Sequence, residues 1–312
     1  MNSLLDVILP VFLLIGLGYG LTHLKWITFE MTDTVMRFSQ SIAIPVLLFG
    51  SIARLDLKQN FHLGLFASFY IGAFSCFILA YLGSFYLFKR PQTDAVAIGF
   101  ACMFSNSLLL GLPITERAYG TSALAANYAI VSLHAPLLYA FGITVMELVR
   151  QRGKDLSSRA LAKQVARTIL HQPLVFGLLL GFTLNFSTLP LPNFFWSAVD
   201  MLATAAIPAA LFGLGGVLYQ YRPEGDIKTI LMAVVITLII HPAITYTLGT
   251  KVFHLTTEQL RSAVLTAAMA PGVNAYLFSN MYGAARRVAA STVLLATVGT
   301  IFTAWGWLQI LP

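Results

Sequence analysis

Long runs of hydrophobic residues recur along the whole chain, and short polar or charged segments separate them. Each run has about the 20 residues that an α-helix needs to cross a bilayer. The runs show no two-residue alternation, so transmembrane strands are not expected. The pattern predicts an all-α integral membrane protein with ten transmembrane helices, at 4–23, 32–53, 62–88, 94–119, 121–148, 168–185, 196–220, 228–250, 258–283 and 288–310.

Composition agrees with this pattern and excludes a water-soluble enzyme. Hydrophobic residues make up 58% of the 312 positions and charged residues 10%, with a mean hydropathy of +0.79. Soluble chains are about 45–50% apolar and about 25% charged. Two cysteines, Cys76 and Cys102, are too few for a disulfide scaffold or a zinc site. We expect neither a metal nor a cofactor.

The basic residues predict how the chain is oriented. Thirteen of the 19 Lys and Arg residues lie in alternate loops on one side, and four lie in the loops of the other side. Because cytoplasmic loops carry the excess of Lys and Arg, the basic loop 150–167 is predicted to be cytoplasmic and both termini outside. The formal charge of +7 is therefore attributed to membrane orientation, with lipid and not nucleic acid as the partner.

The two halves of the chain match each other at a constant offset of 163 residues. The matched triplets and pair are Ala43-Ile44-Pro45 with Ala206-Ile207-Pro208, Leu48-Phe49-Gly50 with Leu211-Phe212-Gly213, and Tyr119-Gly120 with Tyr282-Gly283. We therefore divide the chain into a first five-helix repeat, 1–149, the loop 150–167, and a second five-helix repeat, 168–312. Because five is odd, the second repeat enters the membrane inverted, which is the architecture of many secondary transporters.

Two predicted helices, the fourth and the ninth, carry helix-breaking residues at matching places of the repeat. The fourth contains Gly111 and Pro113, and the ninth contains Pro271 and Gly272. Proline removes a backbone donor, and glycine permits unusual torsions. Freed backbone groups at membrane depth are tolerated where they face protein or a water-filled cavity. The two segments are therefore predicted to be broken helices that cross at a substrate site.

Neutral polar residues next to these breaks complete the predicted substrate site: Ser105, Asn106, Ser107 and Asn274. Half-helix N-termini carry partial positive charge, so such a site attracts anions. The alternative is purely structural, because proline kinks are common in membrane helices and Ser or Asn often ties one helix to its neighbour. The coincidence of two breaks, each with an asparagine, favours the functional interpretation.

The fourth helix, from Asn106 through Gly111, Pro113, Tyr119 and Gly120, resembles that of the auxin efflux carrier family. The resemblance covers essentially the whole chain and implies crossing broken helices 4 and 9. It further implies a scaffold of helices 1, 2, 6 and 7, a moving transport domain of helices 3–5 and 8–10, a homodimer, and Asn106 as a substrate contact. Plant members have proline where this chain has Ser105, and their loop is longer, so auxin is not the expected substrate. A short bacterial member in the inner membrane, carrying malonate, malate or lactate, is expected.

Ionisable residues within the predicted helices are candidates for proton coupling, because charge inside a membrane is costly. They are Asp200, His134 and His241. Asp200 is equally compatible with an interfacial position at a helix N-terminus, and structural histidines are the commoner outcome for the other two. Arg37 follows Asp33 by four residues, which predicts a helical ion pair.

The sequence thus predicts a secondary transporter that moves a small organic anion by alternating access at the helix 4/helix 9 crossover. An anion channel or uniporter is the first alternative. An integral-membrane enzyme is the second, but neither HExxH nor GxSxG occurs in the chain. The chain contains no P-loop motif, so ATP-driven pumping by this chain is not expected.

Overall fold

The computed structural model describes residues 4–150 and 158–312, and these ranges form helices without any strand. The first half contains η1 (Leu4–Ile8), α1 (Leu9–His23), α2 (Phe29–Phe38), η2 (Ser39–Ala43), α3 (Ile44–Ala53), α4 (Leu57–Asn60), α5 (Leu63–Leu82), η3 (Gly83–Leu87), α6 (Gln92–Met103), η4 (Ser107–Gly111), α7 (Leu112–Tyr119), η5 (Thr121–Ala123) and α8 (Leu124–Arg150). The second half contains α9 (Ser158–Leu170), α10 (Pro173–Ser187), α11 (Asn193–Gln220), α12 (Ile227–Val235), η6 (Ile236–Ile240), α13 (His241–Lys251), α14 (Thr257–Ala267), α15 (Val273–Tyr282) and α16 (Arg286–Ile310).

Seven of the predicted segments are single helical stretches long and apolar enough to cross a membrane. An eighth candidate is the pair α9–α10, which bends by 81°. The remaining two predicted helices, 94–119 and 258–283, are each interrupted near their middle, so that neither is one continuous helix. The prediction of an all-helical membrane protein is confirmed, and the chain is an integral membrane protein.

The predicted loop 150–167 is partly helical. Arg150 is the last residue of α8, residues 151–157 lie outside the described residues, and residues 158–167 belong to α9. Leu161, Val165 and Ile169 recur every four residues and are half-buried. Such spacing forms an apolar stripe on one helix face, which explains why this basic segment folds as an amphipathic helix.

Four prolines within helices are preceded by a widened, π-helical turn. Pro10, Pro45, Pro113 and Pro242 each follow the end of such a turn by two residues, at η1, η2, η4 and η6. Proline has no amide and its ring displaces the carbonyl of the preceding turn, so a wider turn lets the helix continue. Pro113 therefore does not break its helix, contrary to the sequence prediction.

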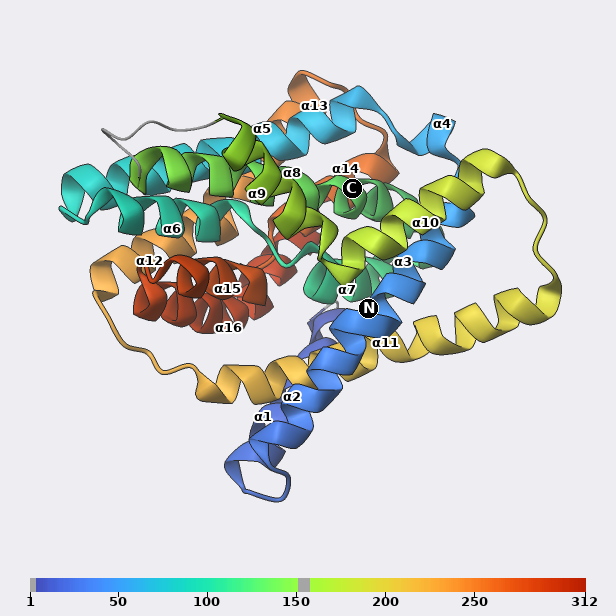
Figure 1. Ribbon diagram of the computed structural model, residues 1–312, viewed down its shortest axis with the longest axis horizontal. Helices are drawn as coiled ribbons and strands as arrows, with labels where there is room; N and C mark the ends of the chain where they lie inside the picture. The colour runs from blue at the N-terminus through green and yellow to red at the C-terminus, as the bar shows by residue number, and fades with distance from the viewer. Residues whose placement is uncertain (1–3, 151–157) are drawn as a thin grey trace.

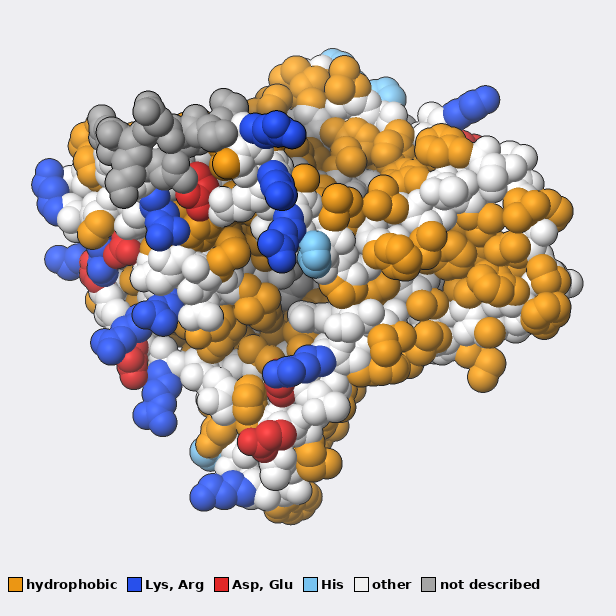
Figure 2. Space-filling view, viewed as in Figure 1, with side chains coloured by type: hydrophobic (Ala, Val, Ile, Leu, Met, Phe, Trp, Pro, Cys, Tyr) orange, Lys and Arg blue, Asp and Glu red, His pale blue; other side chains and the backbone are white. Residues whose placement is uncertain are grey.

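The helices form two groups (Figure 1). In the first, α11 packs against α1, α2 and α3, and α10 packs against α3. The second contains α5, α6, α8 and α12 to α16, in which α6 contacts α5, α8 and α15. Large apolar side chains remain exposed on α10, including Phe176 at 62% and Leu179 at 49%. Figure 2 shows continuous hydrophobic surface over this part of the molecule, as expected for a lipid-facing region.

Candidate functional site

The two interrupted helices meet through their backbones. Between α6 and η4, and between α14 and α15, the chains run antiparallel with Ser105 opposite Pro271. The Asn106 amide donates to the Ala270 carbonyl at 2.7 Å, and the Gly272 amide donates to the Phe104 carbonyl at 3.1 Å. Unpaired backbone groups are costly away from water, so each break supplies the partners that the other needs.

Proline is tolerated at position 271 because the backbone hydrogen bonds of the antiparallel pairing are made by its two neighbours and not by residue 271. The two hydrogen bonds involve the residues on either side of the Ser105–Pro271 pair. The amide that proline lacks is therefore not needed for the backbone pairing. Ala270 is held from the other side as well, since its amide donates to the Thr300 hydroxyl at 3.2 Å.

Two helices begin at this crossing. Asn106 is the N-cap of the helix that starts at Ser107, and its Oδ1 accepts a hydrogen bond from the Leu109 amide at 3.3 Å. Gly272 is the N-cap of α15. The first amides of a helix have no intrahelical acceptor and carry partial positive charge, so the crossing offers two sites that favour negative charge.

A cavity of about 240 Å³ opens at the crossing, and we call it the crossover cavity. It is lined by six residues that the sequence identified: Ser105, Asn106, Ser107, His134, Gly272 and Asn274. No Asp or Glu of the described residues lines it. The combination of neutral polar groups and helix N-termini is compatible with an anion of small volume.

Three other predicted site residues do not reach this cavity. Gly111 and Pro113 lie within the helix that follows the break, and Pro271 lies opposite Ser105 where the two chains run antiparallel. None of the three is among the described residues that line the crossover cavity. The interruption lies upstream of the Gly-x-Pro pattern, at residues 104–106, because the π-helical turn accommodates Pro113.

Sequence reasoning missed three polar residues of the cavity: Gln40, Tyr139 and Gln172. The Tyr139 hydroxyl donates to Asn274 Oδ1 at 3.3 Å, so it orients a predicted site residue. A polar residue within an apolar run was the available signal for Gln40 and Tyr139. Gln172 lies directly before Pro173, at the start of α10.

The two candidate histidines occupy different positions. His134 lines the crossover cavity, where its Nε2 lies 3.1 Å from the Ser105 carbonyl and 3.3 Å from Ser107 Oγ. His241 does not line this cavity; its ring packs against the Phe69 ring, and its Nε2 lies 3.4 Å from the Phe69 carbonyl. Both side chains are buried, and the Nδ1 atom of each has no hydrogen-bond partner among the described residues. Only His134 is therefore placed to meet a solute in the cavity.

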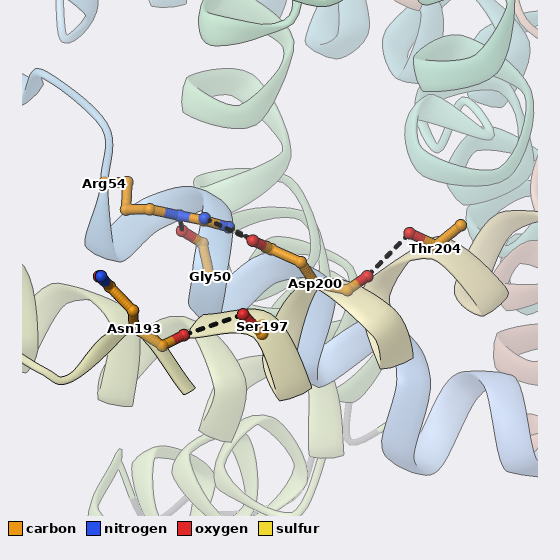
Figure 3. Close-up of polar contacts among 6 residues, drawn as sticks. All are labelled: Gly50, Arg54, Asn193, Ser197, Asp200 and Thr204. Atoms are coloured by element: carbon orange, nitrogen blue, oxygen red, sulfur yellow. Dashed lines mark hydrogen bonds and ion pairs between the residues drawn. The ribbon is translucent and has the colours of Figure 1, made fainter. Parts of the chain in front are cut away.

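Asp200 is not at the crossing. It forms an ion pair of 2.5 Å with Arg54, which links the first part of α11 to the end of α3 (Figure 3). The topology predicted from the sequence places both of these helix ends on the outer side of the membrane. Arg54 Nε also donates to the Gly50 carbonyl at 3.0 Å, and the guanidinium lies over the Trp196 ring. About half of each charged side chain is exposed. The pair lines a second cavity of about 610 Å³, here called the outer cavity.

Comparison with known proteins identifies the family. The model of the membrane transport protein family matches residues 3–308. The chain belongs to this family. This confirms the resemblance to auxin efflux carriers, which was based on the residues of the fourth predicted helix.

Two relatives align over nearly the full length of the chain. A protein of Rhizobium meliloti named "Putative malonate transporter" is 24% identical over 100% of this chain and 97% of its own. An uncharacterized transporter of Methanocaldococcus jannaschii is 21% identical over 97% of this chain and 98% of its own. Both relatives are named as transporters, so this chain is a membrane transporter of the same family.

A solved structure shares the fold. The sodium proton antiporter MjNhaP1 of Methanocaldococcus jannaschii superposes with a TM-score of 0.52, covering 96% of this chain and 91% of the antiporter. The sequences are 13% identical, so the likeness concerns the fold alone.

Proposed function

We propose that this protein is a secondary transporter that moves a small organic anion, a carboxylate, by alternating access at the crossover. The observation that carries the proposal is the crossover cavity, in which two helices begin beside neutral polar side chains with no carboxylate among the described lining residues. A carboxylate gains from helix N-termini and from Asn and Ser donors. Ser105, Asn106, Ser107, Gly272 and Asn274 bind it, whereas Gly111, Pro113 and Pro271 shape the two helices.

Alternating access requires two states of similar energy, which two inverted repeats supply. Reciprocal contacts support this part of the proposal. A side chain at Gly18 of α1 would meet the Phe212 carbonyl of α11, and one at Gly181 of α10 would meet the Phe49 carbonyl of α3. Residues 18 and 181, and 49 and 212, are each separated by the 163 residues of the sequence repeat. Each half thus supplies the glycine to one contact and the carbonyl to the other. Such reciprocal contacts are expected when two halves are related by a two-fold axis.

The substrate class follows from volume and chemistry. A cavity of about 240 Å³ suits a solute of few non-hydrogen atoms. Malonate is the first candidate, since the Rhizobium meliloti relative is named for it. His134 is the first candidate for proton coupling because it lines the cavity, with His241 and Asp200 as the alternatives.

The remaining parts of the proposal concern orientation and assembly. Helices 1, 2, 6 and 7 of the sequence form the scaffold, and helices 3–5 and 8–10 form the transport domain that moves against it. The protein lies in a bacterial inner membrane as a homodimer, with both termini outside and 150–167 in the cytoplasm. A channel or uniporter is the alternative within the same fold, and an enzyme is disfavoured by relatives named as transporters.

The proposal is tested in liposomes with the purified protein. Labelled mono- and dicarboxylates are supplied with and without imposed pH and sodium gradients, and uptake and counterflow are measured. Saturable counterflow of one carboxylate supports the transporter. Unsaturable flux with single-channel currents replaces it with the channel, and conversion of the labelled compound replaces it with an enzyme.

Asn106 is tested by substitutions that separate its two roles. Asn106→Asp retains a helix N-cap but places negative charge in the cavity, so we expect a folded protein without carboxylate binding. Asn106→Ala loses both roles, and we expect binding to be lost together with about 1 kcal/mol of stability. Asn193→Ala, at the exposed start of α11, is the matched control and keeps uptake. Unchanged affinity in Asn106→Asp contradicts the site.

A further inference from the structure

The helix α9 lies at a turn of the chain where the surface changes from charged to apolar. It ends at Leu170, and the following helix α10 leaves at 81°. α10 packs along α3 and exposes Phe176, Leu179 and Leu180 on its outer side. A helix nearly perpendicular to a lipid-facing neighbour runs along the plane of the membrane.

Three cations form a stripe on this helix. Arg159, Lys163 and Arg167 are spaced by four residues and are all exposed, and His171 continues the spacing one turn further. Side chains four residues apart share one face of a helix. Figure 2 shows this column of Lys and Arg side chains over α9, bordered by the hydrophobic surface over α10. None of the ion pairs between described side chains involves the three cations.

The opposite face of α9 is held by the protein. Val165 and Ile169 pack against the apolar cluster that contains Phe69 and Met146. Gln164 Nε2 donates to Glu147 Oε1 of α8 at 2.9 Å. The basic stripe therefore faces away from the protein with a fixed orientation, and rotation of the helix cannot hide it.

We infer that the basic stripe of α9 binds anionic phospholipid headgroups, so that this helix anchors the link between α8 and α10 to the membrane surface. Orientation in the membrane requires only an excess of cations in the loop. It does not require cations on a single face at the edge of the lipid-exposed surface. Headgroup phosphates at that edge meet the cations without burying them, and each cation near an anionic surface strengthens association about fivefold.

The inference is tested with the whole protein in nanodiscs of phosphatidylcholine alone and of phosphatidylcholine with phosphatidylglycerol at about 3:1. Amide hydrogen exchange is followed over residues 158–170. We expect exchange to be about fivefold slower or more with the anionic lipid. The protection should disappear in 0.5 M NaCl, because the Debye length then falls to only a few ångströms.

Two sets of variants test whether the protection depends on the three cations of the stripe or on the total positive charge of the protein. The triple variant Arg159→Gln, Lys163→Gln, Arg167→Gln should exchange alike in both membranes, whereas the control Arg286→Gln, Arg287→Gln should keep the protection. Exchange over α14 reports whether each variant is folded. Equal exchange of the wild-type helix in both membranes overturns the inference. Equal protection by soluble malonate or phosphate in phosphatidylcholine alone also overturns it, since the stripe then binds free anions.

Discussion

At the scale of single residues, the crossing depends on groups that serve more than one purpose. Asn106 donates its amide to Ala270, caps the helix that follows, and lines the crossover cavity. His134 places its Nε2 against the Ser105 carbonyl and also lines the cavity. The proposed ligand contacts and the backbone pairing therefore involve the same few residues.

The two buried histidines give different expected phenotypes. His134→Gln should abolish accumulation driven by a pH gradient but keep counterflow, because the amide retains a hydrogen-bond donor beside Ser105. His241→Gln should keep pH-driven accumulation, because His241 is not among the described residues that line the crossover cavity. The measurement is uptake into liposomes with imposed pH gradients. Equal loss of pH-driven uptake in both variants argues against coupling at His134.

At the scale of helices, close approach between α1 and α11 depends on glycine. A methyl group at Gly18 would meet the Phe212 carbonyl, whereas nothing lies within 4 Å of the corresponding position at Gly16. Gly18→Ala should therefore cost about 1–3 kcal/mol of stability through overpacking. Gly16→Ala should be neutral or slightly stabilising, since alanine favours helix. Thermal unfolding in one detergent compares them, and equal midpoints contradict the packing described.

The start of α12 provides a helix cap with a defined pH dependence. The Thr229 hydroxyl and the Lys228 amide donate to Asp226, with Arg90 3.7 Å away, and these contacts, the Thr229 bond foremost, lower the pKa of the Asp226 carboxyl. A lowered folded pKa stabilises the protein above the unfolded pKa, and this stabilisation is lost as pH falls through the folded pKa.

Asp226→Ala should therefore lower the midpoint of thermal unfolding at neutral pH, by an amount that corresponds to about 1 kcal/mol. The difference from wild type should shrink as the pH is lowered into the range where the wild-type carboxyl is protonated. Unfolding midpoints measured from neutral to acidic pH check this. A difference that stays constant with pH would show that the ionised carboxylate is not the stabilising form.

At the scale of the whole molecule, the two cavities lie one helical turn apart. On three helical segments, the residue lining the crossover cavity is three or four positions from one lining the outer cavity: Ile44 and Leu47, Leu108 and Leu112, and Val131 and Tyr128. These positions are neighbours on one helix face. On these segments, a mostly apolar layer about one helical turn thick therefore separates the two cavities.

This arrangement predicts sided accessibility in oriented vesicles. A membrane-impermeant thiol reagent should label Thr204→Cys in the outer cavity from the periplasmic side, and Ser107→Cys in the crossover cavity from the cytoplasmic side. The native Cys76 and Cys102 are buried and leave a low background. Malonate should protect Ser107→Cys alone. Labelling of both variants from the same side would contradict two cavities on opposite faces.

The sequence predicted much of the fold because its signals are local. Apolar runs of membrane length placed the helices, and the four-residue spacing of Asp33 and Arg37 predicted an ion pair that the structure has at 2.7 Å. The break in the fourth helix was predicted a few residues too late, at Gly111 and Pro113. The effect of a proline depends on whether the preceding turn can widen, and residue type alone does not reveal this.

The sequence by itself determined that this is a helical membrane protein with two interrupted helices, because helix-length apolar runs and helix-breaking residues act within a few positions of the chain. Only the tertiary structure decided that residues 104–106 pair with 270–272, that His134 and not His241 lines the cavity, and that Asp200 pairs with Arg54. Each of these depends on segments more than a hundred positions apart or on which face of a helix packs inward, and packing of the whole chain fixes both.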